Sequence, residues 1–281
     1  MPLLQRSGYP LSPDAAGAAV AGGGTMLFGV PTMYGRLRRE AEEDRALADA
    51  LRRARLLVSG SAALPASEHE AFERSTGQRI AERYGMTETL MNTAVRSDGE
   101  RRAGYVGPAL GGVEIKLVDE EGAEVEEPDE ETIGEVAVRG PNLMLEYLNR
   151  PDATAESVRD GWFHTGDVAT LAPDGYLRIV GRRTTDLIKS GGYKIGAGEI
   201  ESALLEHPAV AEAAVTGEND RDLGERVVAW VVAEGGSSPS ARDLEDHVAG
   251  LLAPHKRPRT VRFLDELPRN DMGKVLKGEL G

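Results

Sequence analysis

The sequence predicts a parallel α/β layer, then a small antiparallel barrel or sheet, and finally a compact α+β unit. Up to residue 84, short apolar strands alternate with helical segments, which is the order typical of a parallel layer. From about 104 to 180 the strands are short, alternate in polarity and are separated by Asp-Gly turns. After residue 181, helices and strands mix over roughly 100 residues, a length that suits a small domain.

Three strands and three helices are expected in the first section. Pro31 and Pro65 suit the first position of a helix, and Ser67 is a candidate N-cap. Residues 1–24 lack periodicity and end in three glycines, so we interpret them as an unassigned linker or frayed terminus. The strands are expected at 25–30, 56–58 and 80–84, and the helices at 31–39, 41–54 and 65–75.

The later sections are predicted from alternation and turn signals. Asp160-Gly161 and Asp174-Gly175 are hairpin-type dipeptides. Residues 119–131 hold nine acids and no base, which predicts a solvated loop. Strands are expected at 113–118, 134–139 and 176–180; past a boundary near 181–185, helices are expected at 197–207 and 240–252 and strands at 210–215, 226–233 and 260–264.

Composition excludes several classes of protein. The 281 residues include 33 Lys+Arg and 47 Asp+Glu, for a net charge of −14, and no cysteine. A disulfide scaffold, a thiolate metal site and a cysteine nucleophile are therefore excluded. The acidic balance argues against nucleic-acid or membrane partners, and the charge-free run 15–35 is too rich in glycine to span a bilayer. We expect a cytoplasmic protein, whose oligomeric state the sequence does not set.

Familiar catalytic motifs are missing. The sequence contains neither of the two common glycine-rich phosphate loops, no zinc-protease helix motif and no nucleophile elbow. The five histidines lie far apart without metal-ligand spacing, so we expect each to be a surface or capping residue. They are His69, His164, His207, His247 and His255.

Two segments have chemistry suited to a nucleotide. In 84–88, Tyr-Gly-Met-Thr-Glu, a strand end leads into a glycine turn that offers amides and the Thr87 hydroxyl to a phosphate and Glu88 to its magnesium ion. An ordinary turn with a helix cap is the alternative. In 161–167, Gly-Trp-Phe-His-Thr-Gly-Asp, Asp167 follows a predicted tight turn and can accept two hydrogen bonds from a ribose diol.

Three further segments complete the pattern. Residues 134–141, from Gly134 to Pro141, form a strand and a turn and are interpreted as structural. Residues 181–195 are a basic, glycine-bearing connector that can bend and let a ligand approach its backbone. In 268–274, Pro-Arg-Asn-Asp-Met-Gly-Lys, the residues around Lys274 favour a shaped loop over a plain surface charge.

These five segments, in this order, resemble the adenylate-forming superfamily of acyl-CoA synthetases, adenylation domains and luciferases. The resemblance covers about 25–281 and implies the C-terminal part of a large AMP-binding domain (25–181) followed by a small domain (182–281), with Thr184 at the hinge. Longer runs are similar to the malonyl-CoA synthetase branch. They are Glu-Arg-Tyr-Gly-Met-Thr-Glu-Thr at 82–89, Arg-Gly-Pro-Asn-Leu at 139–143, Asp-Leu-Ile-Lys-Ser-Gly-Gly-Tyr-Lys-Ile-Gly at 186–196 and Leu-Ala-Pro-His-Lys-Arg-Pro at 252–258.

The resemblance implies a two-step ligase reaction. A carboxylate attacks the α-phosphate of Mg-ATP to give an acyl-adenylate and diphosphate; the small domain then turns about the hinge and the thiol of coenzyme A displaces AMP. The implied substrates are ATP, coenzyme A and a small dicarboxylate such as malonate or methylmalonate, with Mg²⁺ as cofactor. The implied catalytic residues are Lys274, Thr87 and Glu88, with Glu88 as the metal ligand.

Binding roles follow from the same resemblance. Ser59 and Met86 would help form the acyl pocket, and Ser190, Gly191 and Gly192 would line the pantetheine tunnel, where a Cβ would narrow the channel. The implied nucleotide site consists of Gly60, Ser61 and Ala62 along the adenine, Tyr84 stacked on it, Gly85, Thr87 on the α-phosphate, Asp167 and Arg182 on the ribose, and Lys274.

Two departures from the family pattern bear on activity. Many relatives carry Asp or Lys where this chain has Thr184, and nothing before Thr25 resembles the family's Ser/Thr/Gly-rich triphosphate loop with its lysine. We therefore expect the second half of such an enzyme, from a truncated or mis-started gene, with weak or no ATP-dependent ligation. The alternatives are adenylation of another small acid, a carrier-protein thiol as acceptor, or a non-catalytic AMP- or CoA-binding remnant.

Overall fold

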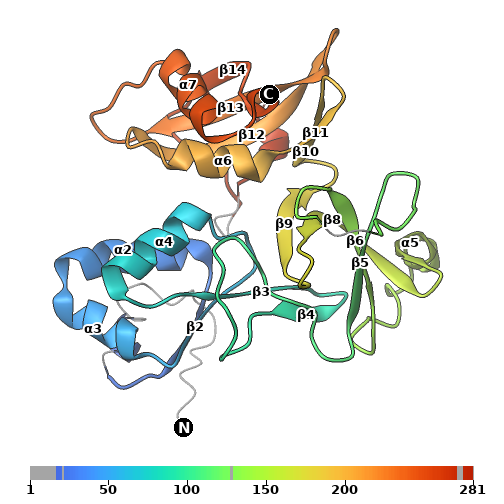
Figure 1. Cartoon of the computed structure of the whole chain (residues 1–281), viewed down its shortest axis with the longest axis horizontal. Coiled ribbons are helices and arrows are strands. Elements are labelled where there is room, and N and C mark those ends of the chain that lie inside the picture. The colour runs from blue at the N-terminus through green and yellow to red at the C-terminus, as the bar shows by residue number, and fades with distance from the viewer. Residues whose placement is uncertain (1–16, 21, 127–128, 271–274, 281) are drawn as a thin grey trace. The chain divides into compact units, whose positions relative to one another are not determined.

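The computed structural model describes residues 17–20, 22–126, 129–270 and 275–280, and its chain forms two compact units (Figure 1). Unit 1 comprises Met1–Val113, Pro141–Met144 and Gly175–Leu177. Unit 2 comprises Glu114–Gly140, Leu145–Asp174 and Arg178–Gly281. The predicted domain division with a hinge at Thr184 stays a prediction.

Unit 1 is built on a four-stranded sheet in the order β1-β2-β3-β4. The first three strands run parallel and confirm the predicted α/β layer. The fourth strand, which follows β3 through a tight turn and pairs with it antiparallel, was not predicted. The strands are β1 (Met26–Gly29), β2 (Leu56–Ser59), β3 (Ala81–Met86) and β4 (Leu90–Ala94).

Three helices connect these strands: α2 (Pro31–Glu43), α3 (Arg45–Arg53) and α4 (Ala66–Thr76). The predicted break near residue 40 is wrong. The helices divide at Asp44, because its carboxylate accepts hydrogen bonds from the backbone N–H groups of Ala46 and Leu47 at 2.8 and 3.2 Å. Ser67 is not the N-cap of α4, since it lies inside the first turn and Pro65 occupies the cap position.

Tyr34 is the polar centre of the unit 1 core. Its side chain is 1 % exposed and packs edge-to-face against Phe72. The hydroxyl donates a bifurcated hydrogen bond to the carbonyl oxygens of Leu27 and Val58, at 3.0 and 2.9 Å, which ties β1 to β2 just before β2 ends. Burial raises the pKa of Tyr34. Val20 is also buried in this core, so the expectation of a frayed linker is wrong for that residue.

The first sheet of unit 2 has the order β5-β6-β8-β7, with β9 paired to β8. The three predicted strands are confirmed, and Asp160-Gly161 forms the turn between β7 and β8 with both φ angles positive. The helix α5 (Pro151–Ser157) and the long strand β8 were not predicted. The strands are β5 (Glu114–Val118), β6 (Gly134–Arg139), β7 (Val158–Arg159), β8 (Trp162–Leu171) and β9 (Leu177–Arg182).

The second sheet of unit 2 has the order β11-β10-β13-β12, with β14 parallel to β13. All five elements predicted for this section are confirmed, and Ser240 forms a capping box with Asp243 at the start of α7. The β10–β11 hairpin was not predicted. The elements are β10 (Leu187–Ser190), β11 (Tyr193–Gly196), α6 (Ala197–Leu205), β12 (Val210–Asp220), β13 (Gly224–Ala233), α7 (Ala241–Leu251), η1 (Pro254–Lys256), β14 (Thr260–Phe263) and η2 (Lys277–Glu279).

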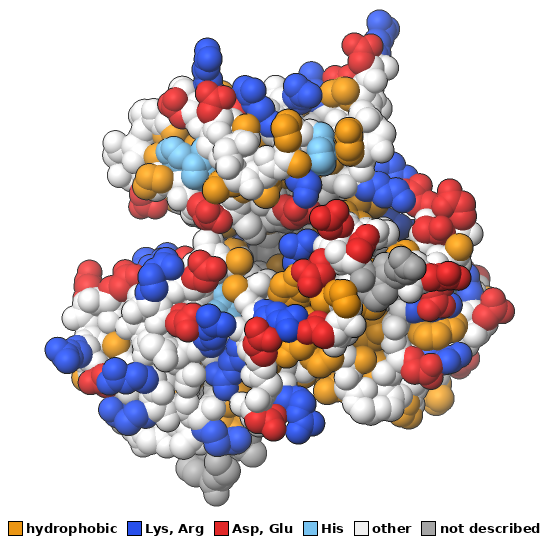
Figure 2. All heavy atoms as spheres, viewed as in Figure 1, with side chains coloured by type: hydrophobic (Ala, Val, Ile, Leu, Met, Phe, Trp, Pro, Cys, Tyr) orange, Lys and Arg blue, Asp and Glu red, His pale blue; other side chains and the backbone are white. Residues whose placement is uncertain are grey.

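The acidic segment 119–131 lies between β5 and β6. Its described residues are mostly exposed, as predicted, and Figure 2 shows acidic side chains gathered where this loop projects. Within unit 2, Glu120 forms ion pairs with Lys189 at 2.8 Å and Lys194 at 3.4 Å. In the part of the chain that the structure describes, no helix is long and apolar enough to cross a bilayer.

Candidate functional site

In unit 1, the predicted nucleotide residues gather at one edge of the sheet. Strands β2 and β3 run parallel, with Ser59 opposite Glu82, so β3 continues past the end of β2. The turn after β2 begins at Gly60, which lies against Arg83: a Cβ there would be 3.1 Å from Arg83 Cγ. The carboxyl ends of adjacent parallel strands form a common ligand-binding edge in open α/β sheets. Gly60, Ser61, Ala62 and Tyr84 all follow or extend these ends.

The turn Thr87-Glu88-Thr89 connects β3 to β4. Its first residue is exposed and Glu88 is half-buried, so the turn can present a hydroxyl and a carboxylate together. The helix cap that was the alternative interpretation is absent here, because the antiparallel strand β4 follows the turn. Gly85 is required by space, since a Cβ would lie 1.9 Å from Leu90 O.

The predicted acyl-pocket residues sit at the two strand ends. Ser59 is the last residue of β2 and is buried, and its Oγ has no hydrogen-bond partner among the described residues. Met86 is the last residue of β3 and is half-buried. Their assignment to an acyl pocket stays a prediction.

In unit 2, Asp167 and Arg182 lie together. Arg182 Nε is 2.9 Å from Asp167 Oδ1, and Arg182 Nη1 donates to Thr165 O at 3.0 Å. The prediction that Asp167 follows a tight turn is wrong, because Asp167 lies within β8. Three residues there, 165–167, face one residue of β6, and Gly166 has a φ of 73°. This β-bulge turns the Asp167 side chain out of the regular alternation.

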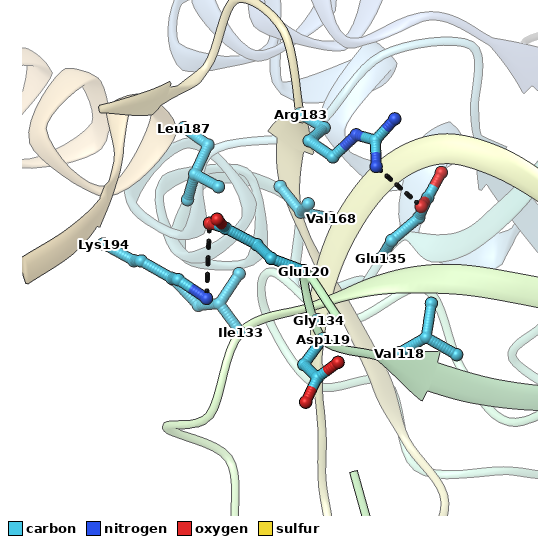
Figure 3. A pocket seen from close by; sticks show the side chains of 10 residues that line it. All are labelled: Val118, Asp119, Glu120, Ile133, Gly134, Glu135, Val168, Arg183, Leu187 and Lys194. Atoms are coloured by element: carbon cyan, nitrogen blue, oxygen red, sulfur yellow. Dashed lines mark hydrogen bonds and ion pairs between the residues drawn. The ribbon is translucent and has the colours of Figure 1, made fainter. Parts of the chain in front are cut away.

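Glu135 is the residue that sequence reasoning missed at this site. The strand containing it was interpreted as structural, yet its carboxylate is 6 % exposed and connects three groups. Oε1 accepts from Gly166 N at 3.0 Å, Oε2 lies 3.1 Å from Arg183 Nη1, and His164 Nδ1 is 3.5 Å away. Figure 3 shows Arg183 and Glu135 pointing toward each other beside a small pocket. A single carboxylate near the start of a strand that is otherwise apolar up to Arg139 was the available signal.

The predicted thiol-site residues form the β10–β11 turn. Gly191 and Gly192 have φ angles of 59° and 83°, the pattern of a type I′ hairpin turn, and Gly191 N donates to Leu223 O at 2.9 Å. No heavy atom lies within 4 Å of a Cβ built on Gly192. Within unit 2, glycine is therefore required by the backbone conformation, whereas the predicted reason was clearance in a channel. Ser190, the residue before the turn, is buried.

Three further predictions concern Thr184, Lys274 and the metal role of Glu88. Thr184 is exposed in the turn after β9, where Thr185 N donates to Arg182 O. Lys274 lies outside the described residues. Among the described residues of the C-terminal segment, Arg269 and Val275 form an isolated antiparallel bridge. Among the described residues, no three His, Cys, Asp or Glu side chains cluster as a metal site. The metal role of Glu88 stays a prediction.

His69 is not the surface or capping residue that was predicted. Its side chain is 1 % exposed, and Nδ1 lies 3.5 Å from Oε1 of Glu82, which also accepts from Gly104 N. Burial raises the pKa of Glu82, and the nearby His69 side chain opposes this shift. The pair joins α4 to β3 inside unit 1, close to the strand end that bears Tyr84.

Comparison with known proteins identifies the family. A model described as AMP-binding enzyme matches residues 8–148, which is half of the chain, and a model described as AMP-binding enzyme C-terminal domain matches residues 199–274. The chain belongs to the AMP-binding enzyme family. Its fold is that of the adenylate-forming enzymes, as the sequence predicted.

The relatives of this AMP-binding enzyme chain include several malonate–CoA ligases. It is 42 % identical to the malonate–CoA ligase of Arabidopsis thaliana, over 98 % of this chain and 46 % of the relative. Among solved structures, an ATP-bound MatB from Rhodopseudomonas palustris matches with a TM-score of 0.85 and 40 % identity, covering 96 % of this chain and 52 % of the other. A malonyl-CoA ligase complex with methylmalonyl-CoA and AMP is 62 % identical, with a TM-score of 0.59, covering 92 % and 55 %. The chain thus spans about half the length of the relatives it matches.

Proposed function

We propose that this chain provides the ribose-binding, phosphate-binding and thiol-binding parts of an AMP-forming ligase that joins malonate or methylmalonate to coenzyme A. The Asp167–Arg182 pair supports it most directly, because a buried carboxylate beside an arginine suits a ribose diol. The 62 % identity to a malonyl-CoA ligase that binds methylmalonyl-CoA and AMP favours this acid and thiol. The proposed substrates are ATP, coenzyme A and a small dicarboxylate.

Most residues of the proposed adenylation site lie on β3 or in the turns that follow β2 and β3. Tyr84 stacks on the adenine beside the Gly60–Ala62 turn, and Thr87 binds the α-phosphate. Glu88 would hold Mg²⁺, since a carboxylate acting with substrate phosphates is a usual magnesium set. The metal would neutralise phosphate charge. Lys274 stabilises the charge that develops as the acid attacks the α-phosphate.

The thiol step is assigned to the β10–β11 hairpin. Its type I′ turn has a defined backbone conformation, and it presents the exposed Gly191 and Gly192 beside the buried Ser190. We propose that the pantetheine arm passes along this turn. Lys189 on β10 and Lys194 on β11 form ion pairs with Glu120 of the β5–β6 loop, and these pairs are partly exposed, so they add little to the stability of the hairpin.

A carboxylate panel tests the proposed reaction. ATP, Mg²⁺ and coenzyme A are mixed with malonate, methylmalonate, acetate or a medium-chain fatty acid, and AMP and acyl-CoA are separated by chromatography. The proposal predicts dicarboxylate-dependent AMP and acyl-CoA, from this chain or after addition of a separately expressed N-terminal half of a relative. Turnover only with monocarboxylates, or only with a carrier-protein thiol, contradicts the assigned substrates. If the chain binds AMP or CoA but no product forms, either alone or with the added N-terminal half, the chain is a non-catalytic remnant that binds nucleotide or CoA.

Asp167→Ala is expected to weaken AMP binding about 10- to 100-fold, because hydrogen bonds to a charged group contribute about 1.5–3 kcal/mol. Calorimetry with AMP and with 2′,3′-dideoxy-AMP measures the effect, and the loss should disappear with the ligand that lacks the diol. The matched control is Asp152→Ala, since Asp152 forms an exposed ion pair with Arg150 in the same unit. Equal losses for both ligands would exclude ribose recognition by Asp167.

A further inference from the structure

The segment Pro141–Met144 lies against the β3–β4 turn within unit 1. Asn142 Nδ2 donates to Thr89 O at 2.7 Å and reaches Met91 O at 3.4 Å. Two residues on, the backbone N–H of Met144 donates to Glu88 O at 2.7 Å. A distant segment therefore holds the turn through backbone carbonyls of the turn itself and of the first residues of β4.

The orientation of the Asn142 amide is fixed by its partners. Carbonyl oxygens only accept hydrogen bonds, so the NH₂ group has to face Thr89 and Met91. The same nitrogen lies 3.2 Å from Asn92 Oδ1, and Asn92 is fully buried on β4. Three acceptors thus surround one donor group, and a reversed amide would place four oxygens together.

The β3–β4 turn contains a strained residue that needs contacts such as those from Asn142 and Met144. Leu90 has a φ of 52°, a left-handed conformation that costs a non-glycine residue on the order of 1–3 kcal/mol and persists where surrounding contacts enforce it. Its side chain is 69 % exposed, so packing of Leu90 itself does little to hold it. Thr89 is fully buried, and its Oγ1 has no partner among the described residues. Together with the β3–β4 pairing and the hydrogen bond from Thr89 N to Met86 O at 3.2 Å, the contacts that Asn142 and Met144 make to the backbone enforce this conformation.

We propose that Asn142 is a positioning residue for phosphate recognition, which fixes Thr87 and Glu88 by holding the backbone of their turn. This inference rests on the proposed function, because it assumes that the Thr87 hydroxyl and the Glu88 carboxylate meet the phosphate and its magnesium ion. Asn142 acts through the carbonyls of Thr89 and Met91. Loss of its NH₂ group frees the turn while leaving in place the residues assigned to the adenine, which are Tyr84 on β3 and the Gly60–Ala62 turn after β2.

The test compares two ligands that differ by one phosphate. Affinities for AMP and for adenosine are measured by calorimetry on the full chain, with the wild type, Asn142→Leu and Asn142→Ser. Asn142→Leu, of similar volume but without donors, should weaken AMP binding about 10-fold and leave adenosine binding unchanged. Asn142→Ser, which keeps one donor, should fall between. If Asn142→Leu does not fold, the comparison uses Asn142→Ser alone.

An asparagine far from the turn in the sequence provides the matched control for this experiment. Asn219→Leu replaces an exposed asparagine on β12 and should change neither affinity. If the Asn142 variants lose AMP and adenosine affinity equally, or lose neither, the positioning role is overturned while the proposed function stands. If the wild type binds AMP no better than adenosine, the phosphate role of the turn fails, and this inference fails with it.

Discussion

Gly85→Ala is expected to lower the free energy of unfolding by about 3 kcal/mol, at the upper end of overpacking effects. The added Cβ would lie 1.9 Å from Leu90 O and 2.9 Å from its carbonyl carbon. Both are backbone atoms of the β3–β4 hairpin, so the clash cannot be relieved by a side-chain rotation. Relief requires the strands to separate, which breaks their pairing and displaces the turn that bears Thr87. Urea denaturation followed by circular dichroism measures the change.

Gly111→Ala is the matched control for this substitution. Gly111 lies in the same unit, has no positive φ, and no heavy atom lies within 4 Å of its added Cβ. Its effect should stay within about 0.5 kcal/mol. Equal stabilities for the two variants would mean that β3 and β4 do not approach each other as described.

Lys277→Met is expected to destabilise unit 2 by about 2–4 kcal/mol at pH 7. Lys277 Nζ lies 2.5 Å from Asp186 Oδ1 and 2.6 Å from Glu201 Oε1, and the variant leaves both carboxylates without a cation. Breaking a buried ion pair costs 3–5 kcal/mol; the range here is lower because the three side chains keep about a fifth of their exposure. Burial lowers the pKa of Lys277, but Glu201 and Asp186 raise it by more, so the ammonium stays charged.

The loss in free energy of unfolding caused by Lys277→Met should depend on pH. Burial raises the pKa of Glu201, and Lys277 opposes that shift; without the lysine the folded-state pKa of Glu201 rises further above its ordinary value of 4.5. A carboxyl with a raised folded pKa favours the folded state below its unfolded pKa, and this contribution is lost as pH rises through the folded pKa. The variant should therefore approach wild-type stability near pH 4.5 and fall behind as pH rises.

Unfolding at a series of pH values measures this dependence. Lys189→Met is the control, because Lys189 is 58 % exposed and its pair with Glu120 is an exposed one. Its stability difference from wild type should be small and flat over the same pH range. A flat profile for Lys277→Met as well would show that Glu201 does not need its cation.

Most of the regular elements were predictable because their signals are local. The apolar strands at 56–58 and 134–139, the Pro31 start of α2 and the Ser240 cap of α7 depend on residues a few positions apart. The strand β4 was missed because its buried positions are polar: Asn92 and Thr93 are fully buried and bind other segments. The β10–β11 hairpin was missed because a glycine pair was interpreted as clearance for a ligand and not as a type I′ turn.

The sequence by itself determined the fold class, the family resemblance and the segments that carry the chemistry, since each of these depends on residues close together in the chain. Only the tertiary structure decided what holds those segments. Glu135 and Arg183 are 48 residues apart in the chain, Asn142 and Thr89 are 53 apart, and Lys277 and Asp186 are 91 apart. Such contacts arise when strands from separate segments pair and bury polar groups that then require partners. Periodicity and turn composition report only on neighbours along the chain, so they do not reveal these pairs.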